Sequence, residues 1–191
     1  MTRSDTALVE ALYDEPFYQR LLVDTPPHER KRVLAAYFAY SLAEAERTGR
    51  VVTAPDPTLG AAAWLLPRTS EVDTVEHEAK REAFARLFGP EGCDNYMRMI
   101  AFMGPRGAAA VPPDAWYLSI LGVHPSAQGG GLGAALVEPT IAEARRAGAV
   151  CWLETFSPRA ERFYARLGFT TCASHHDPTA GADYVIMRLE T

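Results

Sequence analysis

The sequence predicts an α/β or α+β sheet domain, because three features meet in the last third of the chain. Short apolar runs alternate there with helical segments. A turn with four glycines, QGGGLG at residues 128–133, joins the first of these strands to a helix. The pattern ends on two neighbouring strands, as in a hairpin. A chain of 191 residues is long enough to bury a core, so we expect one domain over residues 1–191.

The first half of the chain is expected to be mainly helical. A helical segment at 8–22 is broken near Pro16, and a long helix covers 27–49. Leu34, Phe38 and Leu42 recur at helical spacing and predict a buried stripe on that long helix. The other expected elements are strands at 50–55 and 60–67, helices at 72–89 and 91–104, and a loop at 105–114.

The second half is expected to alternate between strands and helices. Ser157 and Pro158 have the residue types favoured at the N-cap and first position of a helix. Pro139 removes one hydrogen bond inside its helix, so we expect a kink or a loosened turn there. The expected elements are strands at 116–123 and 150–155, helices at 132–147 and 158–167, and final strands near 169–175 and 183–190.

Composition and charge exclude several classes of protein. The formal net charge of −5 argues against a nucleic-acid partner, because phosphate binding requires a basic surface. Cys93, Cys151 and Cys172 form no CxxC pair, so we expect neither a disulfide framework nor a metal site. The N-terminal residues are acidic and lack the apolar core of a signal peptide, and no run reaches the ~18 apolar residues of a membrane span. We therefore expect a cytoplasmic protein with no membrane partner.

The glycine turn has the form of an anion site. The first turn of a helix leaves its N–H groups unpaired, and glycines before it let those groups approach a phosphate closely. A Walker A loop is excluded because no Lys follows the glycines. A Rossmann fingerprint matches loosely, and Glu154 lies near the distance that it requires, so spacing alone leaves that reading open. A plain Gly-rich linker is the structural alternative.

Two motifs in order narrow these alternatives. QGGGLG fits [Q/R]-x-x-G-x-[G/A], and about 25 residues later RAERFYARLGF (159–169) fits A-x-x-F-Y-x-x-x-G-F. Together they resemble the GCN5-related N-acetyltransferase (GNAT) superfamily, and residues 114–190 are most similar to its puromycin N-acetyltransferase group. The resemblance implies a mixed sheet of about six strands, splayed in the middle, with helices on both faces. It also implies an acetyl-CoA-binding core at 114–191 and an acceptor side at 1–113. The superfamily's usual first strand has no convincing candidate here.

The resemblance assigns a set of main-chain and side-chain groups to acetyl-CoA. Strand residues at its splay are expected to bond the pantetheine arm, and the turn is expected to hold the pyrophosphate. Two residues of this set have alternative interpretations. Gly122 could be present only to allow close packing, and Ser157 could serve only as the N-cap of its helix. The residues expected to bind the cofactor are Leu121, Gly122, Val123, Gln128, Gly129, Gly130, Gly131, Leu132, Gly133, Ala134 and Ser157.

Tyr164 and Glu154 are the candidate catalytic residues. A phenol can protonate the thiolate that leaves when an amine attacks the thioester, and a carboxylate can accept the proton of that amine. Glu154 could instead bind the ammonium group or form a surface salt bridge. Other candidate bases are His124, His175 and His176, which are more often structural. Tyr37, Phe38, Tyr40 and Trp64 could line an acceptor pocket, although their spacing is more typical of a core.

The sequence therefore predicts an acetyl-CoA-dependent N-acetyltransferase that modifies a primary amine of a small molecule by direct transfer. Nothing marks Cys151 as a nucleophile, so no acyl-enzyme is expected. Two alternatives stay open: a protein or peptide N-acetyltransferase, and a CoA-binding sensor without turnover. A closed pocket under the helices of residues 8–49 would favour the small amine, and a long groove would favour a peptide. A homodimer is compatible with the sequence.

Overall fold

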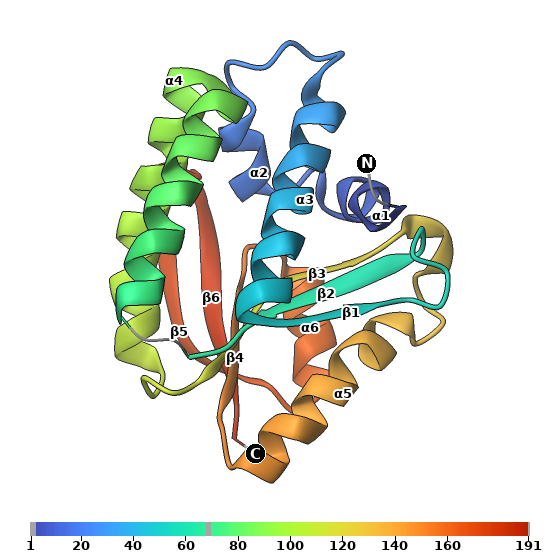
Figure 1. Cartoon of the computed structure of the whole chain (residues 1–191). Coiled ribbons are helices and arrows are strands. Elements are labelled where there is room, and N and C mark those ends of the chain that lie inside the picture. The colour runs from blue at the N-terminus through green and yellow to red at the C-terminus, as the bar shows by residue number, and fades with distance from the viewer. Residues whose placement is uncertain (1–2, 68–69, 191) are drawn as a thin grey trace.

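The computed structural model describes residues 3–67 and 70–190, which form helices packed on a sheet (Figure 1). The helices are α1 (Arg3–Leu12), α2 (Pro16–Leu21), α3 (Arg30–Thr48), α4 (Ser70–Ala110), α5 (Leu132–Ala147) and α6 (Pro158–Arg166). The strands are β1 (Gly49–Thr53), β2 (Gly60–Leu65), β3 (Trp116–Val123), β4 (Cys151–Thr155), β5 (Thr170–Asp177) and β6 (Ala182–Leu189). A short 3₁₀ turn, Pro125–Ala127, lies between β3 and α5.

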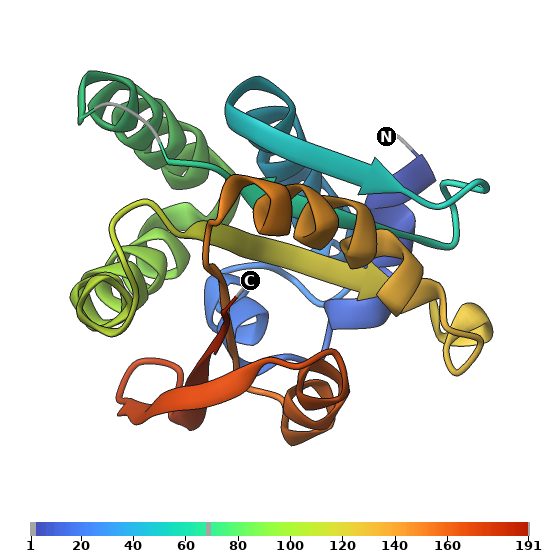
Figure 2. The ribbon, with the colours of Figure 1, turned by 90° about the horizontal axis from the view of Figure 1, so that it is seen from below.

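The strands form one mixed sheet in the order β1-β2-β3-β4-β6-β5. The central pair, β3 and β4, is parallel, and each other neighbouring pair is antiparallel. The two strands β3 and β4 pair only at their beginnings, where Trp116 is opposite Cys151 and Tyr117 is opposite Trp152. Beyond these pairs the strands diverge, and Figure 2 shows β3 moving away from the β6–β5 side of the sheet. The splayed mixed sheet expected from the sequence is confirmed.

Helices cover both faces of the sheet and enclose two apolar cores. The first core lies between one face of the sheet and the helices α1, α2, α3 and α4, and it includes Leu8, Phe38 and Met99. The second core joins α5 and α6 to the other face and includes Val137, Ile141 and Leu153. Figure 1 shows α1 and α3 on one side of β1–β3 and α5 on the opposite side. Burial of these apolar side chains is the main favourable term in folding.

A bulge in β3 directs two nearby side chains, Leu118 and Ile120, into different cores. Ala63 pairs with Ile120 and Trp64 pairs with Leu118, which leaves Ser119 as an extra residue in β3. Side chains two residues apart normally share a face, but an inserted residue reverses that relation. Ile120 accordingly joins the first core and Leu118 the second. The bulge lies beside the splay, where it redirects the end of β3.

Most predicted elements are present, and one prediction is wrong. The helix expected at 72–89 stops at Gly89 (φ 77°, ψ 178°), where the chain reverses before the second half of α4 (Figure 1). Residues 105–110, predicted as part of a loop, continue that second half instead. Pro105 removes a single helical hydrogen bond, and packing of the helix on Trp152 compensates for that loss. Gly107 is buried against the Trp152 ring, and a Cβ at Gly107 would lie 2.8 Å from that ring.

Three further predictions are resolved by these elements. The stripe of Leu34, Phe38 and Leu42 is buried on α3, as expected. The helix α5 passes through Pro139 without a break. As the sequence suggested, α1 is the first element of the part that the structure describes, with no strand before it. In the described residues no helix is both long enough and apolar enough to cross a membrane.

Candidate active site

The glycine turn lies at the end of β3 and opens into the first turn of α5. Gly129 and Gly131 adopt left-handed conformations, with φ of 84° and 85°, which residues with a Cβ adopt at a cost. A Cβ at either position would meet no described atom within 4 Å, so the backbone there is accessible. Gly131 is the N-cap of α5, and the N–H groups of the first helical turn have no acceptor inside the helix. The turn can therefore bind an anion through its main chain, aided by the helix dipole.

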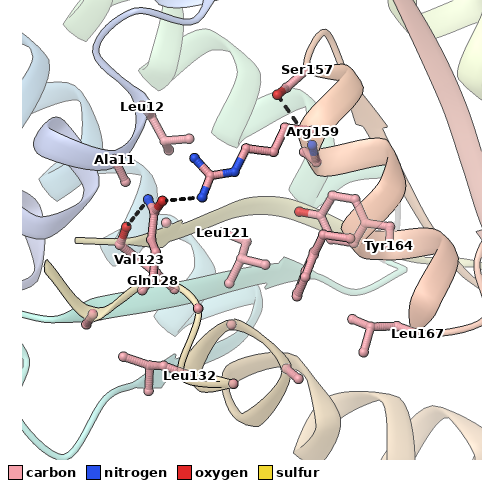
Figure 3. Close-up of a pocket in the computed structure, with 18 of the residues that line it drawn as sticks. Ala11, Leu12, Leu121, Val123, Gln128, Leu132, Ser157, Arg159, Tyr164 and Leu167 are labelled. Atoms are coloured by element: carbon pink, nitrogen blue, oxygen red, sulfur yellow. Dashed lines mark hydrogen bonds between the residues drawn. The ribbon is translucent and has the colours of Figure 1, made fainter. Parts of the chain in front are cut away.

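Gln128 ties this turn to the opposite side of the splay. Its Nε2 donates to the carbonyl of Val123 (2.9 Å), which fixes the turn against the end of β3. Its Oε1 accepts a hydrogen bond from the guanidinium of Arg159 (2.8 Å), on the first turn of α6. Figure 3 shows this guanidinium above the space between β3 and α6. The sequence motif did not reveal Arg159, because motif spacing does not show which exposed side chain of α6 turns toward the glycine turn.

A cavity of about 540 Å³ fills the space between the splayed strands, the turn and α6. It is lined by nearly all of the residues expected to bind the cofactor, with the exception of Gly130. The lining residues from that set are Leu121, Gly122, Val123, Gln128, Gly129, Gly131, Leu132, Gly133, Ala134 and Ser157. Arg159 and Arg166 add positive charge to a wall that also presents main-chain groups, apolar side chains and the carboxylate of Glu15. The cavity matches a long ligand with an anionic end and an uncharged arm.

The packing role considered for Gly122 is present in the structure, where its partner is α1. A Cβ at this buried position would lie 2.6 Å from Leu8 Cδ2 and 3.2 Å from Ala11 Cβ, both on α1. Glycine is thus required for the close approach of α1 to β3, while the strand bulge lies at Ser119. Because α1 packs on β3 at this point, the packing glycine also brings the N-terminal helices to the edge of the cavity.

Ser157 has a double role in the structure. Its hydroxyl accepts the N–H of Ala160 (3.4 Å), the N-cap interaction expected from the sequence. It also hydrogen-bonds to the carboxylate of Glu15, at the start of α2. Glu15 makes no capping bond to its own helix. Burial raises the pKa of Glu15, and the bond from Ser157 partly offsets that rise.

Tyr164 is buried on α6, with its hydroxyl directed toward the middle of the cavity (Figure 3). Its ring packs edge-on against Phe163 and Phe169, with centroids 5.0 and 5.8 Å apart. Burial, and to a smaller extent the charge of Glu15, raise the pKa of Tyr164 above its ordinary value. The phenol therefore keeps its proton at neutral pH and can donate a hydrogen bond.

A second cavity, of about 390 Å³, lies between the sheet and the N-terminal helices. Every helix from α1 to α4 contributes to its wall, together with β3, β4 and α6. Six of its lining residues are aromatic besides Tyr164: Phe17, Tyr18, Tyr37, Tyr96, Tyr117 and Phe156. Of the residues considered from sequence, Tyr37 lines this cavity, whereas Phe38 and Trp64 are core residues.

Glu154 projects from the end of β4 into this second cavity. Tyr117 donates a hydrogen bond to its Oε2 (3.2 Å), while its Oε1 is buried without a partner among the described residues. Burial raises the pKa of Glu154 to about 7, and the bond from Tyr117 acts in the opposite direction. A carboxylate with this pKa can take up and release a proton near neutral pH. The salt bridge considered for Glu154 is not present in the described residues.

The two cavities meet at five shared lining residues: Leu12, Glu15, Leu121, Ala160 and Tyr164. Tyr164 is the shared residue whose hydroxyl can donate a proton, and Glu15 is the shared residue with a carboxylate. Glu15 was not identified from sequence, since nothing in the motifs indicates that the α1–α2 connection approaches α6. The arrangement can bring two ligands, one from each cavity, together at Tyr164.

The other candidate groups lie outside both cavities. The ring of His124 accepts the N–H of Ser126 and shapes the turn after β3, and His176 pairs with Asp183 on the β5–β6 hairpin. His175 packs beside Tyr184. Cys151 is fully buried in β4, and burial raises the pKa of its thiol to about 11, which disfavours a nucleophilic thiolate. Within residues 3–67 and 70–190, no cluster of three or more His, Cys, Asp or Glu side chains is arranged to hold a metal ion.

Residues 94–169, which include β3, the glycine turn, β4 and the motif of α6, match the family model described as the Acetyltransferase (GNAT) family. This segment of the chain is therefore similar to GNAT acetyltransferases. Enzymes of this family use acetyl-CoA as the acetyl donor. The first cavity fits such a donor, because its accessible turn N–H groups suit a pyrophosphate and its apolar wall suits an uncharged arm.

Solved structures show the same fold over almost the whole chain. A Corynebacterium glutamicum protein described as "histone acetyltransferase HPA2 and related acetyltransferase" aligns with a TM-score of 0.69 and 23% identity, over 99% of this chain and 90% of that one. The polyamine N-acetyltransferase of Drosophila melanogaster aligns with a TM-score of 0.64 and 16% identity, over 98% and 93%. A mosquito arylalkylamine N-acetyltransferase-like protein aligns with a TM-score of 0.66 and 13% identity, over 99% and 93%. At these identities the likeness establishes the fold.

Proposed function

We propose that this GNAT acetyltransferase moves the acetyl group of acetyl-CoA to a primary amine of a small molecule. The observation that carries the proposal is the meeting of the two cavities at Tyr164. The first cavity would hold acetyl-CoA through Leu121, Val123 and the turn at 128–134. The second would hold the acceptor, so that the amine and the thioester come together beside the phenol.

Glu154, Tyr164 and Glu15 would each have a separate role in the reaction. Glu154 would accept a proton from the acceptor nitrogen, since it is a carboxylate in the second cavity with a pKa near 7. The nitrogen would bond to the acetyl carbon as the carbon–sulfur bond breaks, while main-chain N–H groups of the splayed β3 polarise the acetyl oxygen. Tyr164 would donate its proton to the sulfur. Glu15, the carboxylate shared by both cavities, would favour an acceptor that arrives as an ammonium ion.

The shape of the second cavity favours a small acceptor over a peptide. Its wall is formed by four helices as well as the sheet, which makes a chamber under the N-terminal half of the chain. Its aromatic side chains suit an amine with an apolar or aromatic body. Two proteins of the same fold are described as polyamine and arylalkylamine N-acetyltransferases, which is consistent with an amine acceptor. The sequence resemblance to the puromycin group adds antibiotic-like amines to the acceptors that we propose to test.

A screen for release of CoA thiol from acetyl-CoA tests this proposal. The panel contains arylalkylamines, diamines, puromycin and a Lys-containing peptide, and mass spectrometry identifies the acetylated product. We expect small amines to be acetylated at the nitrogen and the peptide to react much more slowly. Preferential acetylation of the peptide would support the protein acetyltransferase alternative. Tight CoA binding without release of thiol for any amine would instead indicate a sensor domain.

A further inference from the structure

A buried ion pair lies in the wall of the second cavity. Glu44 on α3 and Lys80 on α4 form this pair, and their side chains are 4% and 17% exposed. Both residues line the cavity. Desolvation of two charges offsets most of their attraction, so a buried pair contributes little net stability. The location of the pair on a ligand-sized cavity therefore suggests a role in recognition.

The pair lies away from the point where the two cavities meet. Glu44 and Lys80 line the second cavity alone, whereas Glu15 and Tyr164 line both. Aromatic rings span the interval. Tyr18 lines the cavity together with Glu15, and its ring lies 5.6 Å from that of Tyr37. Tyr37, Ser41 and Glu44 follow one another at helical spacing on α3, and all three line the cavity. An acceptor whose amino group lies at Tyr164 would therefore place its opposite end near the pair.

The chemistry of the pair selects one kind of group. The opposite charges of the pair nearly cancel, so neither a second ammonium nor a carboxylate on the acceptor would gain a net attraction there. A hydroxyl can donate to the carboxylate and accept from the ammonium at the same time. We propose that the Glu44–Lys80 pair binds a hydroxyl at the far end of the acceptor, which makes the acceptor a hydroxylated aromatic amine. This inference rests on the proposed function and specifies its substrate class.

Three matched amines test the inference: phenylethylamine, tyramine, which adds a para hydroxyl, and para-methoxyphenylethylamine, which can accept but not donate. Calorimetry on the CoA-bound protein gives the affinity of each amine without requiring turnover. We expect tyramine to bind about 10- to 100-fold more tightly than the other two, the effect of a hydrogen bond to a charged group. Equal affinities of the three amines would overturn the inference.

A double substitution, Glu44→Gln with Lys80→Gln, removes both charges with little change in side-chain size. We expect it to reduce the preference for tyramine to about twofold or less, because neutral hydrogen bonds are weaker than charge-assisted ones. Its affinity for CoA is the control and should match that of the wild type. Retention of the full preference in a folded double variant would contradict the inference. If the variant does not fold, the three amines on the wild-type protein still decide it, and failure to transfer acetyl to any amine would count against the proposed function alone.

Discussion

The two cavities that meet at Tyr164 are built in different ways. The first is formed largely by the main chain of one continuous segment, from β3 through the glycine turn to α5, with α6 as its other wall. The second is formed by side chains from α1, α2, α3 and α4 and from the strands beneath them. A main-chain site needs glycine and a helix start, whereas a side-chain site depends on how distant elements pack. The first should therefore serve a ligand common to many proteins, and the second a ligand particular to this one.

Substitution of Tyr164 by Phe tests the point at which both cavities meet, and we expect it to have the largest effect. The ring and its packing remain, but the proton for the leaving thiolate is lost, so turnover should fall by roughly 10²–10⁴-fold. Affinity for acetyl-CoA should change little, as measured by calorimetry. The matched control is Tyr184→Phe, because Tyr184 is also buried but lies outside both cavities. Near-normal turnover of the Tyr164 variant would assign the proton to another group.

Substitution of Gly131 by Val tests the main-chain cavity alone. A branched side chain at φ 85° would strain the turn and obstruct the N–H groups at the start of α5, so CoA affinity should fall about 100-fold. Gly148→Val is the control for strain, because Gly148 is also left-handed (φ 65°) and a Cβ there would meet no described atom within 4 Å, yet it lies at the far end of α5. Both variants should lose similar stability in thermal unfolding. Unchanged CoA affinity in folded Gly131→Val would disprove the anion site.

Substitution of Glu154 by Gln tests the side-chain cavity. In the wild type the carboxylate must be deprotonated to act as a base, so turnover should fall as the pH drops through about 7. In the variant this fall in turnover at low pH should disappear, and turnover at neutral pH should be about 100-fold lower. Part of the lost turnover should return at higher pH, where more of the acceptor is present as the free amine. The exposed Glu138→Gln is the control. A pH–rate profile of unchanged shape would restrict Glu154 to binding.

The contrast between the cavities also explains which parts of the molecule the sequence could predict. The splayed sheet and the residues lining the first cavity were expected from the resemblance to the GNAT superfamily, which rests on local signals: a strand, a run of glycines, a helix start and a second motif. Tyr164 and Glu154 were proposed from the sequence because Tyr164 belongs to the second motif and Glu154 ends the strand before it. Glu15, Arg159, Glu44 and Lys80 were missed, since each reaches its cavity through contacts between elements far apart in the sequence.

Errors in the expected fold have the same origin. A helix was predicted to end at Gly104 and a loop to follow, but contact between Gly107 and Trp152, 45 positions later, extends that helix to Ala110. The packing of Gly122 likewise depends on Leu8, near the N-terminus. Local propensity gives the order of elements well, and it fails where a distant side chain supplies the deciding contact.

The smallest effect concerns the stability of the side-chain cavity and its dependence on pH. Glu154 has a pKa near 7 in the folded protein and an ordinary, lower pKa when unfolded. The folded state therefore binds a proton more readily than the unfolded chain. It is favoured by this group below about pH 4.5, and it loses that advantage as the pH rises through about 7. Gln cannot ionise, so Glu154→Gln should lack this loss.

Denaturant unfolding at several pH values measures this difference. Relative to the wild type, Glu154→Gln should gain stability between pH 5 and pH 8, by on the order of 1 kcal/mol after allowance for the partial exposure of the side chain. The change with pH is the informative quantity, because Gln does not ionise and its own contacts, including the one with Tyr117, stay the same over this range. Glu138→Gln should show no such trend. If the difference in unfolding free energy between the two proteins is the same at every pH, burial does not raise the pKa of Glu154. The second cavity would then lack a carboxylate with a pKa near 7, on which the proposed role of Glu154 as a base depends.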